Sequence, residues 1–294
     1  MFGKTLKKLT CCALATIGAV ACAGTMTACE SSHPEVQIQI EFNDTTYKLN
    51  YKLYRKVAPS TVEHFLWLAD NGYYDGLCVH DYDAKDARLY TGAYTYSAEE
   101  SLYGGLTYKK YYDVIQTYSD YDKFPTSVWA NKNKTNALYT LVGEFKDNAF
   151  TVESNALKEE FGSLTMYYTA KTVDDNVYVP YQKKDKKGEM RRVAYKYNSA
   201  TSMFYISMTE TEKTNNAYCT FATLKGGSVD DLEELQQAIN DYIAANYDET
   251  ENFTARESVI VDKDDVFIGD RTSTASYDIP QEPIIIKSVK VKKY

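Results

Sequence analysis

The chain has 294 residues, of which 44% are hydrophobic and 25% are charged, and its formal net charge at pH 7 is -8. This composition is typical of a folded globular protein with one large core or two small ones, so an intrinsically disordered chain is excluded. The acidic balance, with no basic stripe to offset it, also excludes a protein that binds nucleic acid through its phosphates.

The first 28 residues are predicted to be an export signal. Lysines at positions 4, 7 and 8 precede an apolar stretch from about Leu9 to Ala23, which is shorter than the ~20 residues that a membrane-spanning helix requires. Removal of the signal takes these three lysines from the 33 basic residues, so 30 would remain against 41 acidic ones, a net charge of -11.

The signal ends in a motif that predicts lipidation. Met26-Thr27-Ala28-Cys29 resembles the bacterial lipobox, in which the cysteine is acylated and becomes the new N-terminus. Cys29 is therefore the predicted lipidated residue, and residues 29–35 would link an anchor in the bacterial cell membrane to an extracytoplasmic domain. Cys22 is a weaker candidate for the same modification, and an ordinary cleaved signal is the alternative to both.

The folded domain is predicted to span residues 36–294 and to begin with a β-hairpin. "VQIQIEF" at 36–42 and "YKLNYKLY" at 47–54 alternate apolar and polar residues on either side of Asn43-Asp44. This pattern is typical of two paired strands joined by a tight turn.

Two helices are predicted from apolar residues at helical spacing. The first begins at Pro59 and ends at Asn71-Gly72; on it, Trp67 is expected to pack in the core and His64 to lie on the surface. The second covers "VDDLEELQQAINDYIAANY" at 229–247, with acidic residues in its first turn.

Short β-like runs occupy much of the remaining chain. They are "LYTLVGEF" at 138–145, "GSLTMYYTA" at 162–170, "SMFYISM" at 202–208, "AYCTFATL" at 217–224 and "PIIIKSVKV" at 283–291. Because the helices do not alternate with these strands, the order favours one closed antiparallel barrel with two helices over a βαβ arrangement.

Three stretches do not belong to a minimal barrel: residues 94–137, 173–198 and 248–278. None has an apolar pattern sufficient for its own core, so we expect all three to decorate a single barrel, and a separate second domain is the less favoured alternative. The first is rich in tyrosine and contains Trp129. Its rings suit a stacking platform for peptide or sugar and equally suit a loop that packs on itself.

Several collinear segments resemble one family. They are "VAPSTVEHFLWLADNGYYDG", "LVGEFKDNAF", "EEFGSLTMYYTA", "TSMFYISM", "CTFATLKGG" and "EPIIIKSVKV", and they look like the cyclophilin-type peptidyl-prolyl cis-trans isomerases, in particular the bacterial branch, over about residues 36–292. The resemblance implies a mainly β fold, a closed eight-stranded antiparallel barrel capped by two helices. It also implies action on proline-containing peptides without a cofactor.

The catalytic positions of that family are altered in this chain. Isomerisation rotates a partial double bond over a barrier of ~18–20 kcal/mol, and a donor that draws on the prolyl amide lowers this barrier. In the family the donor is the arginine of a Phe-His-Arg strand, supported by a Gln-Gly-Gly strand. Here Val79-His80-Asp81 and Tyr90-Thr91-Gly92 stand at these places. Arg88 could reach back into the groove, although a surface arginine is the favoured interpretation.

The resemblance also implies a peptide groove. Its candidate residues are His80, Met166, Tyr167, Phe204, Tyr205 and Tyr218. Tyr205 would be the floor under the proline ring, whereas His80 is more often a structural histidine than a catalyst.

The cysteines beyond the lipobox predict no metal site. Only Cys78 and Cys219 remain, too few for a zinc site or a disulfide framework. We expect both to be small buried residues, and whether they pair depends on the distance between their Cα atoms.

Two functions follow as hypotheses. The first is a lipid-anchored isomerase-like protein that assists the folding of exported proteins through their prolyl segments, with weak activity because Asp81 replaces the arginine. The second is a non-catalytic lipoprotein that binds peptides, a partner protein or cell-wall material. A cationic side chain beside the apolar pocket would favour the first.

Overall fold

The computed structural model describes residues 31–84, 87–98, 105–146, 157–166, 172–181, 186, 188–196, 199–209, 218–248, 253–262 and 272–294. The predicted signal, Cys29 and Tyr167 lie outside these ranges. Within them, no helix is long and apolar enough to cross a membrane.

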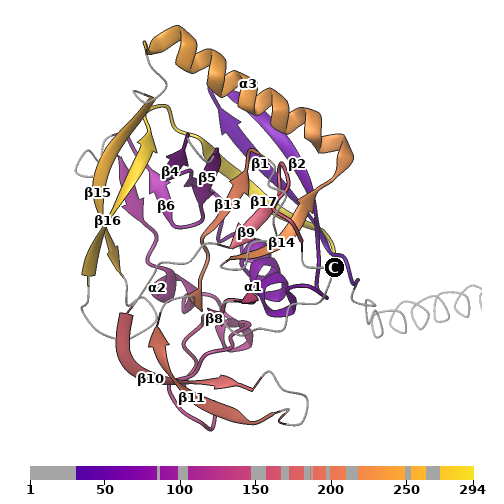
Figure 1. The fold of residues 1–294 in the computed structure, drawn as a ribbon, viewed down its shortest axis with the longest axis vertical. Coiled ribbons are helices and arrows are strands. Elements are labelled where there is room, and N and C mark those ends of the chain that lie inside the picture. Colours follow the sequence, from indigo (N-terminus) through magenta and orange to yellow (C-terminus); the bar gives the residue numbers. More distant parts are fainter. Residues whose placement is uncertain are drawn as a thin grey trace, which may run out of the picture.

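An eleven-stranded antiparallel sheet forms the main body of the described fold (Figure 1). In spatial order its strands are β4 (Asp81–Asp83), β5 (Arg88–Thr91), β13 (Phe204–Ser207), β9 (Leu164–Met166), β14 (Cys219–Leu224), β2 (Thr45–Leu53), β1 (Glu35–Phe42), β17 (Ile285–Lys293), β3 (Leu77–Cys78), β6 (Tyr94–Tyr96) and β7 (Leu106–Tyr108). The sheet curls around the main hydrophobic core. The expectation of a mainly β fold is thus confirmed.

The closed eight-stranded barrel is present only in part. β3 and β4 follow each other in the chain, yet they lie far apart in the strand order. The link between them carries Val79, whose N–H donates to the Ile284 carbonyl at 2.8 Å, and His80, whose N–H donates to the Tyr90 carbonyl at 2.9 Å. At this link the chain leaves its pairing with the β17 side of the sheet and joins β5. The sheet is therefore a curled half-barrel, and not a ring of eight continuous strands.

The predicted N-terminal hairpin is confirmed as β1 and β2, which pair from Glu35–Lys52 to Phe42–Thr45. Asn43 and Asp44 at its turn have φ angles of 46° and 61°. Two successive positive φ angles match the right-handed twist of the flanking strands, and Asn and Asp adopt them more readily than most residues.

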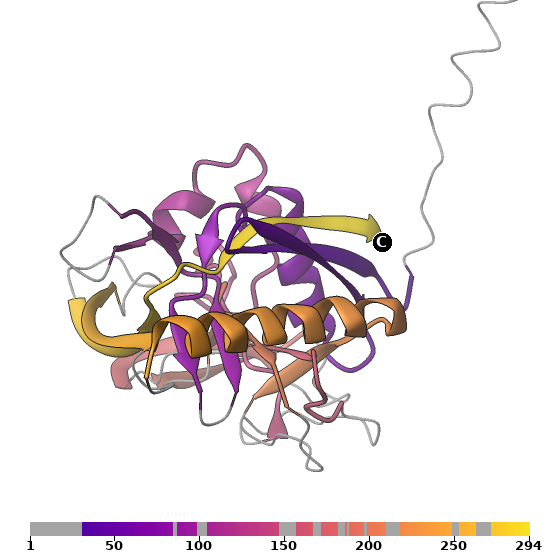
Figure 2. The ribbon, with the colours of Figure 1, turned by 90° about the horizontal axis from the view of Figure 1, so that it is seen from above.

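Both predicted helices are present. α1 (Pro59–Asp70) buries its apolar face against β17 and β14, and α3 (Val229–Asn246) packs against β2 and β1. Figure 2 shows α3 running across these strands. The short helix α2 (Tyr111–Ile115) and the 3-10 turns η2 (Tyr121–Lys123) and η5 (Gly226–Ser228) complete the described helical structure.

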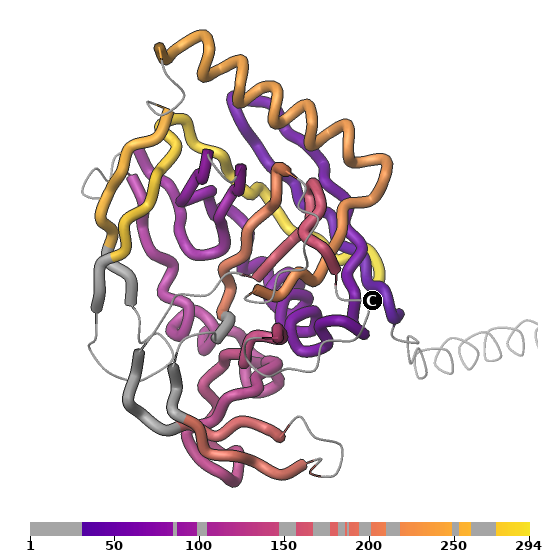
Figure 3. Tube along the Cα trace, viewed as in Figure 1, coloured from indigo at the N-terminus to yellow at the C-terminus, as the bar shows by residue number. Residues whose placement is uncertain are grey.

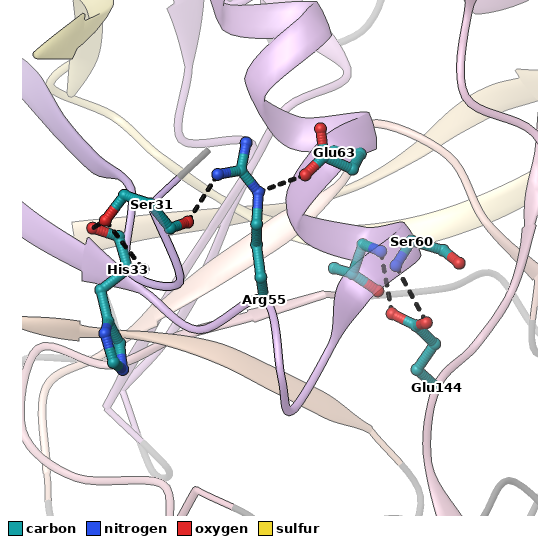
Figure 4. A network of polar contacts seen from close by, with 7 residues as sticks. Ser31, His33, Arg55, Ser60, Glu63 and Glu144 are labelled. Carbon is teal, nitrogen blue, oxygen red and sulfur yellow. Dashed lines mark hydrogen bonds and ion pairs between the residues drawn. The ribbon is translucent and has the colours of Figure 1, made fainter. Parts of the chain in front are cut away.

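The first turn of α1 is capped by a residue from far along the chain (Figure 4). The buried carboxylate of Glu144 accepts hydrogen bonds from the backbone N–H groups of Ser60, at 3.0 Å, and Thr61, at 2.8 Å. Ala58, at the N-cap, has no side-chain hydrogen bond to offer. Burial raises the pKa of Glu144, whereas the two N–H donors oppose that rise. The cap therefore ties residues 141–146 to the helix.

His64 corrects one expectation: it is buried instead of lying on the helix surface. Its Nδ1 is 2.9 Å from the Pro125 carbonyl and its Nε2 is 2.8 Å from the Thr201 carbonyl. Burial lowers its pKa to about 4, and a neutral imidazole can donate to only one of these two carbonyls. The helix-surface prediction was wrong because the 94–137 segment packs over α1.

Three described rings of the 94–137 segment, those of Tyr94, Tyr111 and Phe124, are buried, and most of the others are partly exposed. Tyr111, Ile115 and Phe124 belong to the main core, and the ring of Phe124 lies 4.4 Å from that of Trp67, which confirms the packing role of Trp67. Tyr94 is buried in a second, smaller core. These buried rings therefore fit the role of a packed segment better than that of a stacking platform for a ligand.

The other two insertions form hairpins that local patterns did not predict. β10 (Thr172–Pro180) pairs with β11 (Met190–Lys196), and a bridge between Trp129 and Tyr178 joins this hairpin to the first insertion, beside a small apolar cluster. The remaining short pair is β8 (Leu141–Val142) with β12 (Ser199–Ala200).

β15 (Thr254–Asp262) pairs with β16 (Thr272–Pro280), and β16 packs against β4 (Figure 3). The third insertion therefore lies beside the strand that carries Asp81.

Candidate functional site

The candidate residues Asp81, Tyr90 and Tyr205 lie in one row across the sheet. Asp81 of β4 is opposite Tyr90 of β5, Tyr90 is opposite Tyr205 of β13, and Tyr205 is opposite Thr165 of β9. Directly opposed residues in antiparallel strands share a face. The flanking residues Leu89, Phe204 and Ile206 belong to the main core, so the row points away from that core.

Arg88 lies on the same face as Tyr90, because side chains two residues apart in a strand point the same way. Its guanidinium carbon is 4.9 Å from the centre of the Tyr205 ring, and its side chain is 19% exposed. Burial opposes its charge, but Tyr205 and Glu159 outweigh this and raise the pKa of Arg88 above its ordinary value. Strand alternation relates Arg88 to Tyr90, but its place over Tyr205, instead of the expected surface position, also depends on the pairing of β5 with β13.

Glu159 is a residue that the sequence-based reasoning missed. Its buried carboxylate accepts hydrogen bonds from Arg88 Nε at 3.0 Å, from the Tyr205 hydroxyl at 3.1 Å and from Ser207 Oγ at 3.3 Å. It thus holds the guanidinium over the ring. An acid in the loop before a strand carries no local signal of such a role.

Two further tyrosines surround Tyr205. The Tyr90 ring lies 5.1 Å from it and the Tyr218 ring 6.0 Å from it, between ring centres. Burial raises the pKa of Tyr90 to about 12, although its hydrogen bond with Arg88 acts in the other direction. The result is an aromatic cluster with one cation over its central ring, and that ring is 0% exposed.

Asp81, which the resemblance puts at the family's arginine position, is engaged with the β15–β16 hairpin. Its Oδ1 accepts a hydrogen bond from the backbone N–H of Asp278 in β16 at 2.8 Å. Burial raises its pKa to about 6, against the effect of that hydrogen bond. Asp81 therefore joins the β15–β16 hairpin to the sheet, and when ionised its carboxylate only accepts hydrogen bonds.

His80 lies in the link just before β4 and is 0% exposed. Its ring packs 4.9 Å from each of Tyr94 and Tyr277, and neither ring nitrogen has a hydrogen-bond partner in the structure. Burial lowers its pKa to about 3. The geometry agrees with the structural role and leaves His80 out of reach of a peptide.

Met166 and Phe204 are not part of the candidate groove. Both belong to the main core, where they lie opposite each other in β9 and β13. The sequence placed them in the groove without distinguishing the two faces of these strands. Tyr167 lies outside the described residues, and Tyr218 remains beside Tyr205.

Gly92, the one residue retained from the family's Gln-Gly-Gly strand, has a structural reason to be glycine. Its φ is +100°, and a Cβ there would lie 2.4 Å from the Ser202 carbonyl. The Ser202 hydroxyl donates in turn to the Gly92 carbonyl at 2.5 Å. This close approach sets the position of β5 relative to β13.

The described residues include no group of three His, Cys, Asp or Glu side chains arranged to hold a metal ion. Cys78 and Cys219 are free and buried, as expected, and burial raises the pKa of Cys78 to about 12. The site therefore offers a guanidinium donor, aromatic rings and a buried carboxylate. This set can polarise an amide but supplies no activated nucleophile.

Comparisons with known proteins point to one family. Residues 37–261 match the family model described as "Cyclophilin type peptidyl-prolyl cis-trans isomerase/CLD". Proteins of Staphylococcus aureus and Staphylococcus haemolyticus, each described as "Putative peptidyl-prolyl cis-trans isomerase", are 35% identical over 71 residues, 24% of this chain. The matched part is only 36% of the length of the S. aureus relative and 35% of the other.

Solved cyclophilin structures are similar over most of the chain but at low identity. The cyclophilin-type isomerase of Cryptosporidium parvum has a TM-score of 0.43 and 16% identity, and the match covers 89% of this chain and 99% of that one. The Mimivirus cyclophilin has a TM-score of 0.39 and 14% identity, covering 90% and 92%. The family model spans most of the domain, and on that match the chain belongs to the cyclophilin-type peptidyl-prolyl cis-trans isomerase family.

Proposed function

We propose that this protein is a slow peptidyl-prolyl cis-trans isomerase that acts on prolyl segments of exported proteins at the bacterial cell surface. Family membership supports the reaction type. The observation that carries the proposal for this chain is the guanidinium of Arg88, which lies 4.9 Å over the Tyr205 ring and beside Tyr90. The extracytoplasmic setting rests on the predicted export signal and lipobox.

Arg88 supplies a donor from a different strand than the family's arginine. Rotation about an Xaa-Pro bond makes and breaks no covalent link, so the site needs only to grip the proline and stabilise the amide as its resonance is lost. Tyr205 provides an apolar ring for the grip. Arg88, always charged, provides N–H donors toward the prolyl amide.

Two features of the same site support slow turnover. Tyr205 is 0% exposed, so a proline ring reaches it only when the guanidinium moves aside. Glu159 opposes this movement, because its carboxylate is bonded to both Arg88 and Tyr205. At the family's own donor position stands Asp81, and the loss of one preorganised donor typically costs ~100- to 1,000-fold in rate.

A proline isomerisation assay on residues 30–294 tests the proposal, with a cyclophilin that keeps its arginine as the reference. We expect kcat/KM to be at least ~100-fold below the reference. Arg88→Ala should lower kcat a further ~10-fold or more while peptide binding is retained, and Arg88→Lys should keep part of the rate through its charge. Arg192→Ala, an exposed arginine of β11, is the matched control.

The assay also separates the second candidate, a non-catalytic peptide-binding module. The engagement of Asp81 by the Asp278 N–H favours this alternative, because it ties the family's donor position to a structural contact. Peptide binding without measurable isomerisation would establish the alternative. Full cyclophilin-like turnover, or turnover unchanged in Arg88→Ala, would contradict the role given to Arg88.

A further inference from the structure

We propose that the outward side of β2, β1 and β17 binds the surface of an anionic lipid membrane. Five lysines define this lysine face: Lys48, Lys52, Lys56, Lys290 and Lys293. The proposal concerns a part of the domain distant in the strand order from β4 and β5, and it does not depend on isomerase activity.

Strand register brings the lysines together. Lys52 of β2 and Lys293 of β17 lie on either side of Glu35 in β1. One step along, Gln37 has Lys290 as its β17 partner, and the next outward residue, Gln39, has Lys48 as its β2 partner. Outward residues repeat every ~7 Å along a strand and neighbouring strands lie ~4.8 Å apart. These four lysines are therefore spread over one continuous surface, and Lys56, in the turn after β2, lies near His33 together with Lys52 and Lys293.

This face carries more positive than negative charge, although Glu35 lies between Lys52 and Lys293, which both help to lower its pKa after the larger effect of Lys225. Lys48, Lys56, Lys290 and Lys293 are exposed, and no ion pair joins them to a carboxylate in the described part of the chain. The two acids of β1 are engaged by other lysines, Glu35 by Lys225 at 2.7 Å and Glu41 by Lys287 at 3.1 Å. In a chain of net charge -8, this is a local reversal of sign.

The opposite side of the same strands is apolar and filled. Val36, Ile38 and Ile40 of β1 belong to the main core, as do Leu49 and Tyr51 of β2. α3 also packs into that core. The lysine face is thus the solvent side of a rigid sheet, held in shape by the core behind it.

The described chain begins at the edge of this face. The Ser31 N–H donates to the Tyr294 carbonyl at 2.9 Å, and Arg55 Nη1 donates to the Ser31 carbonyl at 2.6 Å. Lys52, Lys56 and Lys293 are close enough to His33 to lower its pKa, after the larger effect of burial. Ser31 follows the predicted lipidated Cys29 by two residues, so an anchor there would bring this face to the lipid headgroups.

This position favours a membrane over a soluble anionic polymer as the partner. Figures 1 and 2 both place the C-terminal end of β17 on the opposite side of the molecule from the β15–β16 hairpin. A membrane against the lysine face would therefore leave the hairpin, and β4 beside it, directed away from the lipid. Each lysine near an anionic surface strengthens binding about fivefold.

Vesicle binding of residues 30–294, which lack both the predicted signal and the predicted lipidated Cys29, tests the proposal. Binding is measured by sedimentation with vesicles of phosphatidylcholine alone and with vesicles of which about a third is phosphatidylglycerol. The triple variant Lys48→Gln, Lys290→Gln and Lys293→Gln should bind the anionic vesicles ~100-fold more weakly. The matched control changes three exposed lysines elsewhere, Lys110→Gln, Lys123→Gln and Lys132→Gln, and should keep the parent's affinity.

The comparison between variants isolates the lysine face, because both triple variants lose the same number of positive charges. Added salt should weaken binding to the anionic vesicles by screening, in the parent and control but far less in the face variant. Equal losses in the two triple variants would overturn the proposal, as would equal binding to both kinds of vesicle. Binding of polyphosphate without binding of anionic vesicles would overturn it in favour of a soluble polymer.

Discussion

At the scale of single residues, the candidate site holds a cation on β5. Arg88 places its guanidinium over Tyr205 and on the face of Tyr90, whereas Asp81, which the resemblance puts at the family's arginine position, is in the neighbouring strand β4. Side-chain alternation contributes to this placement, because residues 88 and 90 point the same way. The buried carboxylate of Glu159 keeps the cation in place.

Glu159→Gln should destabilise the fold by about 2–3 kcal/mol, because it removes a buried charge that accepts hydrogen bonds from Arg88 and Tyr205. Glu63→Gln is the control: Glu63 pairs with Arg55, but its side chain is 41% exposed, so its loss should cost less than about 1 kcal/mol. Urea denaturation of both variants measures the difference. Equal losses would contradict the anchoring role of Glu159.

Asp81 predicts a pH dependence with a definite sign. Its pKa is about 6 in the folded protein, against 3.8 for the ordinary group. The folded state therefore holds the proton over this interval while the unfolded chain releases it, and stability falls as the pH rises from about 4 to 6. Asp81→Asn should gain stability relative to the natural protein between pH 4 and 7, by at most about 3 kcal/mol.

Urea denaturation at several pH values checks this difference. His80 acts in the opposite direction, because its pKa falls from 6.5 to about 3 and its contribution to stability is lost as the pH falls below 6.5. The comparison with Asp81→Asn removes this background, since His80 is present in both proteins. A difference that does not change with pH would show that Asp81 titrates normally.

At the scale of elements, α1 depends on a cap that only tertiary structure provides. Glu144→Ala leaves the N–H groups of Ser60 and Thr61 without their acceptor, in a buried place beside the helix N-terminus. We expect a loss of about 2 kcal/mol in the free energy of unfolding. Glu144→Gln, which keeps one acceptor oxygen, should lose less. Thermal unfolding of the two variants distinguishes the cap from general packing, for which both would lose equally.

The 94–137 segment is part of the core, so truncation of its rings should show in stability. Tyr111 is buried and its hydroxyl donates to the Tyr139 carbonyl at 2.7 Å, so Tyr111→Ala should cost about 3–5 kcal/mol. Tyr121 of the same segment is 40% exposed, and Tyr121→Ala should cost less than about 1 kcal/mol. Chemical denaturation gives both values. If Tyr111→Ala were as stable as the natural protein, the segment would not contribute to the core.

At the scale of the whole molecule, lipidation of Cys29 remains a prediction of the sequence. Mass spectrometry of the mature N-terminus should find an acylated Cys29, because it ends the lipobox. Cys29→Ser should release the protein to the medium, since stable retention depends on the acyl chains. An unmodified mature end that begins after Cys29 would contradict the anchor.

The local sequence pattern was sufficient to predict those strands and helices in which apolar side chains recur on one face. The period of two in residues 36–54, the helical spacing after Pro59 and in 229–246, and the turn at Asn43-Asp44 each depend on neighbours in sequence. All four elements are present with nearly the expected bounds. The order of motifs likewise pointed to the family and to the altered residues Asp81 and Tyr90.

Only the tertiary structure determined which residues from distant parts of the chain lie next to one another. The approach of Arg88 to Tyr205 depends on the register of β5 and β13, and the contact between Asp81 and Asp278 joins residues 197 positions apart. The lysine face likewise combines β2 with β17, so no stretch of sequence is basic enough to reveal it. Local periodicity states which face of a strand is apolar, but register between distant strands is set by packing and backbone pairing across the whole sheet.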